Sequence, residues 1–466
     1  MIALTVEQIA AAIGGTVIGD QSVTITGSVE TDSRLVKAGA LFVAKPGEET
    51  DGHLFVEQAR QAGAVASIVQ QKVESSSIAQ ILVPDSVAAL GELAKYVLAK
   101  VREVSELKVI GVTGSNGKTT TKNMLREILS GAGKTIAPIE SYNNEVGAPY
   151  SILQVDESTK YLVVELGAGG PGSIKYLAEI ARPDIAVVLK VGLAHVGEFG
   201  GIETTAKIKA ELVVAMHDSG TLALNHDDGY VRDMAELSSS KKVWFGTSAD
   251  SNYRATELEL SIDGTAFTLT RPDATESKVH LKILGEHHVM NALAALSVAD
   301  QLGIDRSSAI KALENMPLAE RWRMQLMQRS DGVTIINDAY NASPDSTKAA
   351  LQTLAQLGRT GRRTVAVLGE MAELGSASRE QHDAIGRLVV RLNIDQLVVV
   401  GAGAKLIHMG AEQEGSWAGE SKYFESIAEA LAYLREMLVA GDLVLVKSSK
   451  SANLRHLGDD LVEVNS

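Results

Sequence analysis

The chain has 466 residues, which favours about three domains, and its 45% hydrophobic and 22% charged residues are typical of a globular protein. Its 44 Lys and Arg against 58 Asp and Glu give a formal charge of -14, which argues against nucleic acid as a main partner. The absence of cysteine excludes disulfides, thiolate nucleophiles and zinc sites built on cysteine.

Residues 1–105 are predicted to form a small α/β module. Between residues 40 and 69 the sequence indicates a strand, a polar loop, a helix and a second strand. A helix from about residue 86 to 101 leads to a charged segment at 102–108, where we predict a domain boundary and a hinge. The N-terminus lacks the features of a signal peptide, and the chain has no apolar run near 18 residues. We expect a cytoplasmic protein without stable membrane insertion.

Residues 106–317 are predicted to form a central domain around a parallel sheet. Its apolar strands are separated by helices and lack internal polar alternation, a pattern typical of a sheet that is covered on both faces. VWFGT (243–247) and AFTLTRP (266–272) indicate an antiparallel addition, and a helix over 288–303 should end at Gly303.

Residues 318–466 repeat the alternation of strand and helix and predict a second doubly wound, Rossmann-like domain after a hinge near Pro317. The predicted fold is therefore α/β with three domains. A small N-terminal α/β module is followed by a central P-loop ATPase domain and a Rossmann-like C-terminal domain.

The segment GVTGSNGKTTTK (111–122) predicts a nucleotide-phosphate site. It follows an apolar strand and opens a helix with one apolar stripe, which is the context that a phosphate-binding loop needs. Gly114 and Gly117 would let backbone N–H groups approach phosphates, Lys118 would reach the terminal phosphates, and Thr119 would offer its hydroxyl to Mg2+. Valine at 112 departs from the usual glycine, and a plain helix-capping turn is the alternative reading.

Two polar residues follow other predicted strands at the same sheet edge. Glu165 lies at the C-terminal end of YLVVEL (161–166) and could hold Mg2+, although a strand-terminal surface carboxylate explains it equally well. His195 lies in the loop LAHVGEFGG, where a lone histidine is usually only a polar surface residue. Its place at the same edge as Glu165 favours a functional role.

Lys209 interrupts an apolar stripe of the predicted helix GIETTAKIKAELVVAM, whereas Lys207 points elsewhere. A buried ammonium is costly unless it is paired or chemically changed. On the residues alone, a snorkelling or paired lysine is the favoured interpretation.

Nearly the whole chain resembles the Mur ligase family, the ATP-dependent amide-forming enzymes of peptidoglycan precursor synthesis. The segments that carry the resemblance are TDSRLVKAGALFVA, DGH, GVTGSNGKTT, SYNNEVGAP, VVELGAGGPG, LAH, AKIKAEL, GEHHVMNALAA, INDAYNASPDS and VLGEMAELG. NDAYNASP and LGEMAELG are most similar to members that add D-alanyl-D-alanine to UDP-N-acetylmuramoyl-tripeptide. The sequence has no match to the DNPR-type motif of the diaminopimelate-adding members.

The resemblance implies roles for individual residues. The predicted ATP-binding residues are Gly114, Ser115, Asn116, Gly117, Lys118, Thr119, Thr120, Asn291, Arg323 and Asp338. The predicted substrate residues are Thr31, Asp32, Ser33 and Arg34 at the UDP end, and Asn143 and Asn144 in an acceptor-side loop. Thr119 and Glu165 match ligands of one Mg2+, and His195 with Glu165 and Lys209 matches a second metal site. Lys118, Glu165, His195 and Lys209 are the predicted catalytic residues, and Lys209 aligns with a lysine that is N-carboxylated in several members.

Some positions depart from the family pattern. In LAERWRMQ, Arg323 is chosen over Arg321 because methionine follows it, and Gln325 replaces an acid. Ser448 and Lys450 stand where a KGSR-like segment has glycine and arginine, and lysine does not reproduce a two-pronged arginine contact. The pocket for the second substrate is therefore the part of the resemblance with the weakest residue-level support.

The implied reaction passes the γ-phosphoryl group of ATP to the tripeptide carboxylate, and the amine of D-alanyl-D-alanine then attacks the acyl phosphate. We expect a monomer that uses two Mg2+ ions. The closest alternatives are a diaminopimelate- or lysine-adding ligase of this family and a folylpolyglutamate-type synthetase. A nucleotide-controlled switch that performs no ligation is the alternative of another class. The sequence leaves open whether the third peptide residue is lysine or diaminopimelate.

Overall fold

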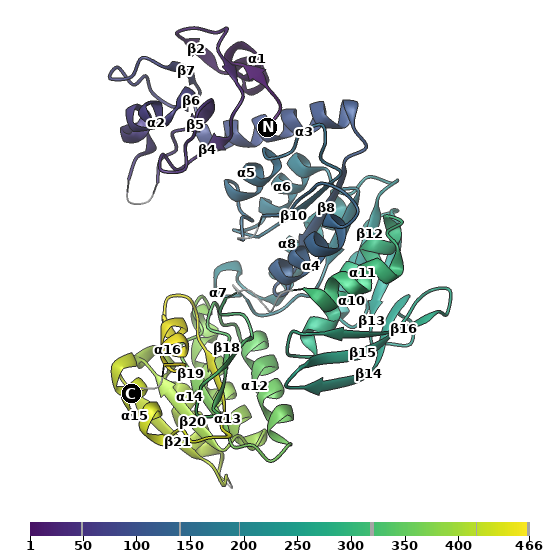
Figure 1. Ribbon diagram of the computed structural model, residues 1–466, viewed down its shortest axis with the longest axis vertical. Coiled ribbons are helices and arrows are strands. Elements are labelled where there is room, and N and C mark those ends of the chain that lie inside the picture. The colour runs from purple at the N-terminus through teal and green to yellow at the C-terminus, as the bar shows by residue number, and fades with distance from the viewer. Residues whose placement is uncertain (48–49, 139–140, 195, 317–320, 416, 464–466) are drawn as a thin grey trace.

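The computed structural model describes residues 1–466 except 48–49, 139–140, 195, 317–320, 416 and 464–466. Three groups of elements follow one another along the long axis of the molecule (Figure 1). Each of the three groups has its own larger sheet, and most strand pairs in these sheets are parallel. The predicted α/β fold class with three domains is confirmed.

The N-terminal module has a five-stranded sheet of order β2-β7-β6-β5-β4. Its strands are β2 Thr16–Ile18, β4 Val29–Glu30, β5 Ala40–Val43, β6 Ala64–Val69 and β7 Ala79–Leu82, with a separate pair β1 Leu4–Thr5 and β3 Thr24–Ile25. Its helices are α1 Val6–Ile13, the short 3-10 helix η1 Gly52–Phe55, α2 Val56–Ala62 and α3 Ser86–Val104. A capping box starts α1, because Thr5 accepts from the Gln8 N–H while the Gln8 side chain accepts from the Thr5 N–H.

Helix α3 belongs by its packing to both of the first two groups. It contacts α1 of the N-terminal module and also α5 (Gly147–Ile152) and α6 (Ser173–Ala181) of the central group. Leu90, Leu93 and Val97 on its inner face are fully buried in one apolar core that extends from residue 4 to residue 235. The predicted boundary at 105/106 therefore follows a helix that ties the two groups together.

The central sheet has nine strands in the order β16-β15-β14-β13-β12-β11-β8-β10-β9. Its strands are β8 Lys108–Thr113, β9 Thr135–Ile136, β10 Tyr161–Glu165, β11 Ile185–Val188, β12 Thr221–Asn225, β13 Lys241–Gly246, β14 Tyr253–Ser261, β15 Gly264–Thr270 and β16 Glu276–Leu281. Its other helices are α4 Lys118–Ser130, α7 Val196–Phe199, α8 Ile202–Val214, α9 Gly229–Met234, η2 Ala235–Leu237, α10 His287–Gln301 and α11 Arg306–Asn315. The helix predicted over 288–303 thus ends two residues before Gly303, which has φ +70°.

The antiparallel addition was predicted correctly at residues 266–272 but wrongly at 243–247. Strand β15 pairs antiparallel with β14 and β16, whereas β13 pairs parallel with both β12 and β14. The chain returns from β12 through α9 and η2 before it forms β13, and such a crossover joins parallel strands. A strand pattern read by itself does not reveal this crossover.

The C-terminal sheet has six strands in the order β17-β18-β22-β19-β20-β21, and only β17 is antiparallel to its neighbour. Its strands are β17 Gln325–Gln328, β18 Thr334–Asn337, β19 Thr364–Leu368, β20 Gln396–Val400, β21 Glu420–Phe424 and β22 Leu443–Lys447. Its helices are α12 Pro344–Gly358, η3 Gly375–Ala377, α13 Ser378–Arg391, η4 Ala402–Ala404, α14 Lys405–Glu414, α15 Ile427–Met437 and α16 Leu454–Asp460. Two separate apolar cores lie on its two faces, one under α12, α13 and α14 and one under α15 and α16, as in a doubly wound domain. Among the described residues, no helix is long and apolar enough to cross a membrane.

Candidate nucleotide and ligation site

The turn between β8 and α4 has the backbone of a phosphate-binding loop. Gly114 and Gly117 have φ values of +152° and +85°, which side chains rarely allow. A Cβ at Gly117 would lie 2.4 Å from Asn291 Oδ1, so the loop also needs glycine for space. No side chain caps α4 at Gly117, so the first N–H groups of the helix remain available to an anion.

The predicted P-loop residues and Glu165 come together at the carboxyl ends of two neighbouring strands. Glu165 pairs in register with Val112, which places its side chain beside the start of α4. Thr119 Oγ1 donates to Glu165 Oε2 at 3.1 Å, and Asn143 Nδ2 donates to Glu165 Oε1 at 2.9 Å. The buried hydroxyl and carboxylate are hard oxygen ligands of the kind that Mg2+ prefers, so Thr119 and Glu165 fit the predicted metal role.

Lys118 lies directly at this site. Its Nζ donates to Gly114 O at 2.8 Å within the loop. Burial lowers the pKa of Lys118, and the charge of Glu165 opposes that shift while Arg323 adds to it. A lysine that is largely withdrawn from water and lies near the Glu165 carboxylate is well placed to meet the negative charge of a phosphoryl group.

Lys209 is buried on α8 with 3% of its surface exposed, while Lys207 on the same helix is exposed. Burial is the main cause that lowers the pKa of Lys209 to about 7. The neighbouring charge of Lys118 adds to this shift, and Glu211 and Glu165 oppose it. The structure therefore brings Lys209 into the electrostatic range of the P-loop lysine and Glu165.

Predicted His195 lies outside the described residues. The described His, Asp and Glu side chains form no group of three suited to a metal.

A cavity of about 240 Å³ lies over the P-loop between the central and C-terminal groups. Arg323 reaches it from the C-terminal side: its guanidinium stacks on Tyr340 at 4.1 Å and its Nη2 approaches Ser141 Oγ at 3.5 Å. Asp338 lines the same cavity and pairs with Lys447 at 2.6 Å. Nine of the ten predicted ATP residues line it: Ser115, Asn116, Gly117, Lys118, Thr119, Thr120, Asn291, Arg323 and Asp338. The tenth, Gly114, belongs to the P-loop but is not among the lining residues.

The predicted UDP-binding residues line another cavity, of about 710 Å³, in the N-terminal module. Thr31, Asp32, Ser33 and Arg34 contribute to its wall together with Lys45, Phe42 and Phe55. Asp32 and Arg34 form a two-pronged ion pair with its closest contact at 2.6 Å, and hydrogen bonds from Arg34 lower the pKa of Asp32 to about 2.

A third cavity, of about 400 Å³, lies between the other two. It shares Thr31, Asp32 and Lys45 with the N-terminal cavity and Ser141 with the P-loop cavity. The predicted acceptor-loop residues divide between two of the cavities, since Asn144 lines the middle one and Asn143 lines the P-loop cavity. The three cavities therefore form a row from residues 31–34 to residues 114–120.

Family models match the chain in three consecutive parts. They are the Mur ligase family catalytic domain over residues 26–98, the Mur ligase middle domain over 112–299 and the Mur ligase glutamate ligase domain over 322–450. A relative from Mycobacterium tuberculosis, strain ATCC 25618 / H37Rv, named UDP-N-acetylmuramoyl-tripeptide--D-alanyl-D-alanine ligase, is 42% identical and covers 99% of this chain and 98% of its own. The chain belongs to the Mur ligase family.

Further Mur ligases resemble the chain over its full length. The Bacillus subtilis protein of the same name is 34% identical over 99% of both chains. Among solved structures, MurF from Acinetobacter baumannii has a TM-score of 0.89 at 33% identity and 99% coverage of both chains. A MurF ligase from Thermotoga maritima in complex with ADP has a TM-score of 0.82 at 28% identity, covering 94% of this chain and 98% of its own. The predicted family is confirmed.

Sequence reasoning missed several residues of this Mur ligase site. His287, His288, Tyr340 and Lys447 line the P-loop cavity, and burial lowers the pKa of His287 to about 4, which leaves its ring neutral at pH 7. Lys447 ends an apolar strand at the ligand-binding edge of a parallel sheet, a signal that could have identified it. The two histidines lie within the segment GEHHVMNALAA that also contains Asn291, but the direction of their side chains is not readable from the sequence.

Proposed function

We propose that this Mur ligase joins D-alanyl-D-alanine to UDP-N-acetylmuramoyl-tripeptide at the expense of ATP. The observation that carries the proposal is the row of three cavities, which meet at Thr31, Asp32 and Lys45 and again at Ser141. A substrate with a nucleotide at one end and a carboxylate at the other fits such a row, since its UDP end would bind at residues 31–34 and its carboxylate would reach Lys118. The full-length relatives that bear the name of this reaction support the same assignment.

The residues of the chain supply binding, orientation and charge stabilisation. Backbone N–H groups of the P-loop and of the first turn of α4 bind the triphosphate, and Lys118 meets the charge that develops on the γ-phosphoryl group. Asn291, Arg323 and Asp338 enclose the nucleotide from α10 and the C-terminal group. Their part in the mechanism is to hold the γ-phosphorus in line with the tripeptide carboxylate and to exclude water.

In the first step, a carboxylate oxygen of the tripeptide bonds to the γ-phosphorus while the bond to ADP breaks. In the second step, the amine of D-alanyl-D-alanine attacks the acyl carbon, phosphate leaves with the C–O bond electrons, and the amine loses a proton. When bound, Mg2+ would neutralise phosphate charge, with Thr119 and Glu165 as ligands of one ion and His195, Glu165 and Lys209 at a second. We further propose that the enzyme acts as a cytoplasmic monomer.

Phosphate release from ATP tests this function directly. We expect release that requires both UDP-N-acetylmuramoyl-tripeptide and D-alanyl-D-alanine, and a product whose mass equals the two substrates less one water. Lys118→Ala should lower turnover about a thousandfold or more because it removes charge stabilisation in the transition state. Lys108→Ala, which changes an exposed lysine at the start of the preceding strand, is the matched control.

Phosphate release that is independent of the tripeptide would overturn the proposal and favour a nucleotide-controlled switch. Product formed with diaminopimelate, lysine or glutamate in place of the dipeptide would favour the alternative ligases. Normal turnover by a folded Lys118→Ala variant would contradict the role assigned to the P-loop.

A further inference from the structure

Glu30 is a buried carboxylate that the proposed mechanism does not use. It ends β4, and 6% of the residue surface is exposed. Hydrogen bonds from Ser28 and from Tyr150 of α5 reach the carboxylate, but its Oε2 has no partner among the described residues. Burial raises the pKa of Glu30, and these hydrogen bonds oppose the shift, as does the charge of Lys37.

This carboxylate lines the middle cavity, which the N-terminal module and the central group form together. Tyr142 and Tyr150 pack edge to face with ring centres 5.3 Å apart and form part of its wall with Leu35 and Val146. Its charged lining residues are Glu30, Asp32 and Lys45. The cavity therefore combines apolar and aromatic surface with two carboxylates and one lysine.

A carboxylate oxygen that is withdrawn from water without a hydrogen-bond partner carries an uncompensated desolvation cost in the free protein. A ligand group that donates a hydrogen bond to this oxygen removes that cost, and a cationic donor gains more than a neutral one. Asp32 is already held by Arg34, so Glu30 is the carboxylate of this cavity with an oxygen left for a ligand.

We propose that Glu30 binds the terminal ammonium group on the side chain of the last residue of the tripeptide. This inference rests on the proposed function, which places the reacting carboxylate of that residue beside Lys118. Ser141 lines both the P-loop cavity and the middle cavity, so the two cavities adjoin and the side chain of the same residue would extend from the first into the second. Its methylene groups would lie against the tyrosines. The lysine side chain ends in such an amine, and the diaminopimelate side chain ends in an amine beside a second carboxylate.

Three tripeptide substrates test whether the charge of this amine, rather than another part of the substrate, determines binding. Their last residue is lysine, meso-diaminopimelate or Nε-acetyl-lysine, and D-alanyl-D-alanine and ATP are kept saturating. We expect the wild-type enzyme to show a KM at least tenfold lower for one of the amine-bearing substrates than for the acetylated one. The arm with the lowest KM identifies which of the two residues the enzyme accepts.

Glu30→Gln keeps the shape of the side chain and removes its charge. We expect this variant to raise the KM for the preferred amine-bearing substrate about tenfold, with kcat within about twofold, and to leave the KM for the acetylated substrate unchanged. Tyr150→Phe, which removes one hydrogen bond to Glu30, should shift the same KM in the same direction by a smaller factor. Glu74→Gln, at an exposed glutamate of the same module, should change neither KM.

Equal KM values of the wild-type enzyme for amine-bearing and acetylated substrates would overturn the inference, even if Glu30→Gln does not fold. A folded Glu30→Gln variant that loses the same factor on all three substrates would also overturn it, because that result indicates a purely structural role. Failure of the proposed function gives a different result, since the wild-type enzyme would then join D-alanyl-D-alanine to none of the three tripeptides.

Discussion

Lys209 combines burial with a neighbouring cation, which makes its charged form unfavourable. Within the described part of the chain, no carboxylate forms an ion pair with its ammonium group, and burial lowers its pKa to about 7. An amine with this pKa is substantially neutral at pH 7 to 8, and a neutral amine is the form that adds carbon dioxide. The C–N bond forms as a proton leaves, so the product is an anionic carbamate. We propose that this form, rather than the snorkelling lysine favoured by the residues alone, acts in catalysis.

Lys209→Ala tests the carbamate. We expect ligation to fall about 10- to 100-fold, the usual cost of removing a group that supports a metal site, and to recover in part when a short carboxylic acid is added. The added carboxylate would replace the lost anion. Lys207→Ala, which changes an exposed lysine of the same helix, is the control and should retain full activity. Full activity of Lys209→Ala without added acid would contradict the carbamate.

The pH dependence of the carbamate provides a second readout. Below pH 7 the amine is protonated and does not add carbon dioxide, so carbamate occupancy should decrease as the pH falls from 8 to 6. Carbon-13 NMR of protein equilibrated with labelled bicarbonate should show a carbamate signal at pH 8 that weakens at pH 6 and is absent from Lys209→Ala.

Some site residues were correctly predicted to lie together. They are either close in sequence or lie at the ends of neighbouring strands. The P-loop spacing places Lys118 and Thr119 directly, and the strand-end rule places Glu165 beside them. The ion pair between Asp338 and Lys447 joins residues 109 positions apart, and it forms only because β18 and β22 are neighbours in the sheet. The sequence pattern carries no direct signal of that adjacency, so Lys447 was missed.

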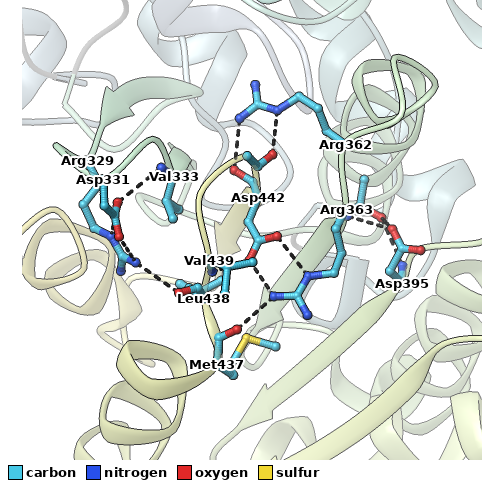
Figure 2. A network of polar contacts seen from close by, with 12 residues as sticks. Arg329, Asp331, Val333, Arg362, Arg363, Asp395, Met437, Leu438, Val439 and Asp442 are labelled. Carbon is cyan, nitrogen blue, oxygen red and sulfur yellow. Dashed lines mark hydrogen bonds and ion pairs between the residues drawn. The ribbon is translucent and has the colours of Figure 1, made fainter.

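At the scale of elements, the start of β22 is held by a buried carboxylate at the sheet edge opposite the nucleotide site. Figure 2 shows Asp442 facing Arg363, whose Nη2 and Nε donate to its two oxygens at 2.6 and 2.9 Å. Val439 N–H donates to the same carboxylate at 2.9 Å, and Arg362 donates to Asp442 O at 3.0 Å. The network joins the starts of β19 and β22 to the end of α15.

Asp442→Ala should destabilise the C-terminal group without touching the site. Since Asp442 is 1% exposed while Arg363 reaches water, we expect a loss of about 2–3 kcal/mol in the free energy of unfolding, near the lower range for breaking a buried ion pair. Urea titration followed by the fluorescence of Trp322 and Trp417 measures it. Asp383→Ala removes a more exposed partner of Arg387 and should cost less than about 1 kcal/mol. Equal losses in the two variants would contradict this account.

Elements were predicted best where one local pattern decides the structure. Several buried parallel strands read as apolar runs and were predicted close to their observed positions, for example β8 and β10. The parallel strands β4, β7 and β21 were not predicted. The direction of β13 was wrong because it depends on the crossover through α9 and η2 rather than on the strand itself. The two-residue strands β1 and β3 carry no periodicity, and only their pairing with each other defines them.

At the scale of the whole molecule, α12 connects the C-terminal group to the loop that precedes residue 195. Asp345 Oδ2 accepts from the Leu193 N–H at 2.8 Å, and its Oδ1 lies 3.3 Å from Lys190 Nζ. A Cβ at Gly192 would lie 2.5 Å from this carboxylate, so glycine permits the close approach. Ser343 Oγ, next to α12, approaches Asn116 Oδ1 of the P-loop at 3.4 Å. These contacts join α12 to the central group on the C-terminal side of the P-loop cavity.

Asp345→Ala should weaken the contact between α12 and the central group, which we expect to help close the site over ATP. Removing a charge-assisted hydrogen bond from the contact is expected to raise the KM for ATP about fivefold to tenfold and to lower kcat, because the open form binds nucleotide with fewer partners. Binding of UDP-N-acetylmuramoyl-tripeptide in the absence of ATP should change by less than about twofold, because Asp345 lies outside the cavities lined by residues 31–34. Steady-state kinetics and calorimetry measure the two effects. Glu425→Gln, at an exposed carboxylate of the C-terminal group, is the control. An unchanged KM for ATP in Asp345→Ala would show that closure does not depend on this contact.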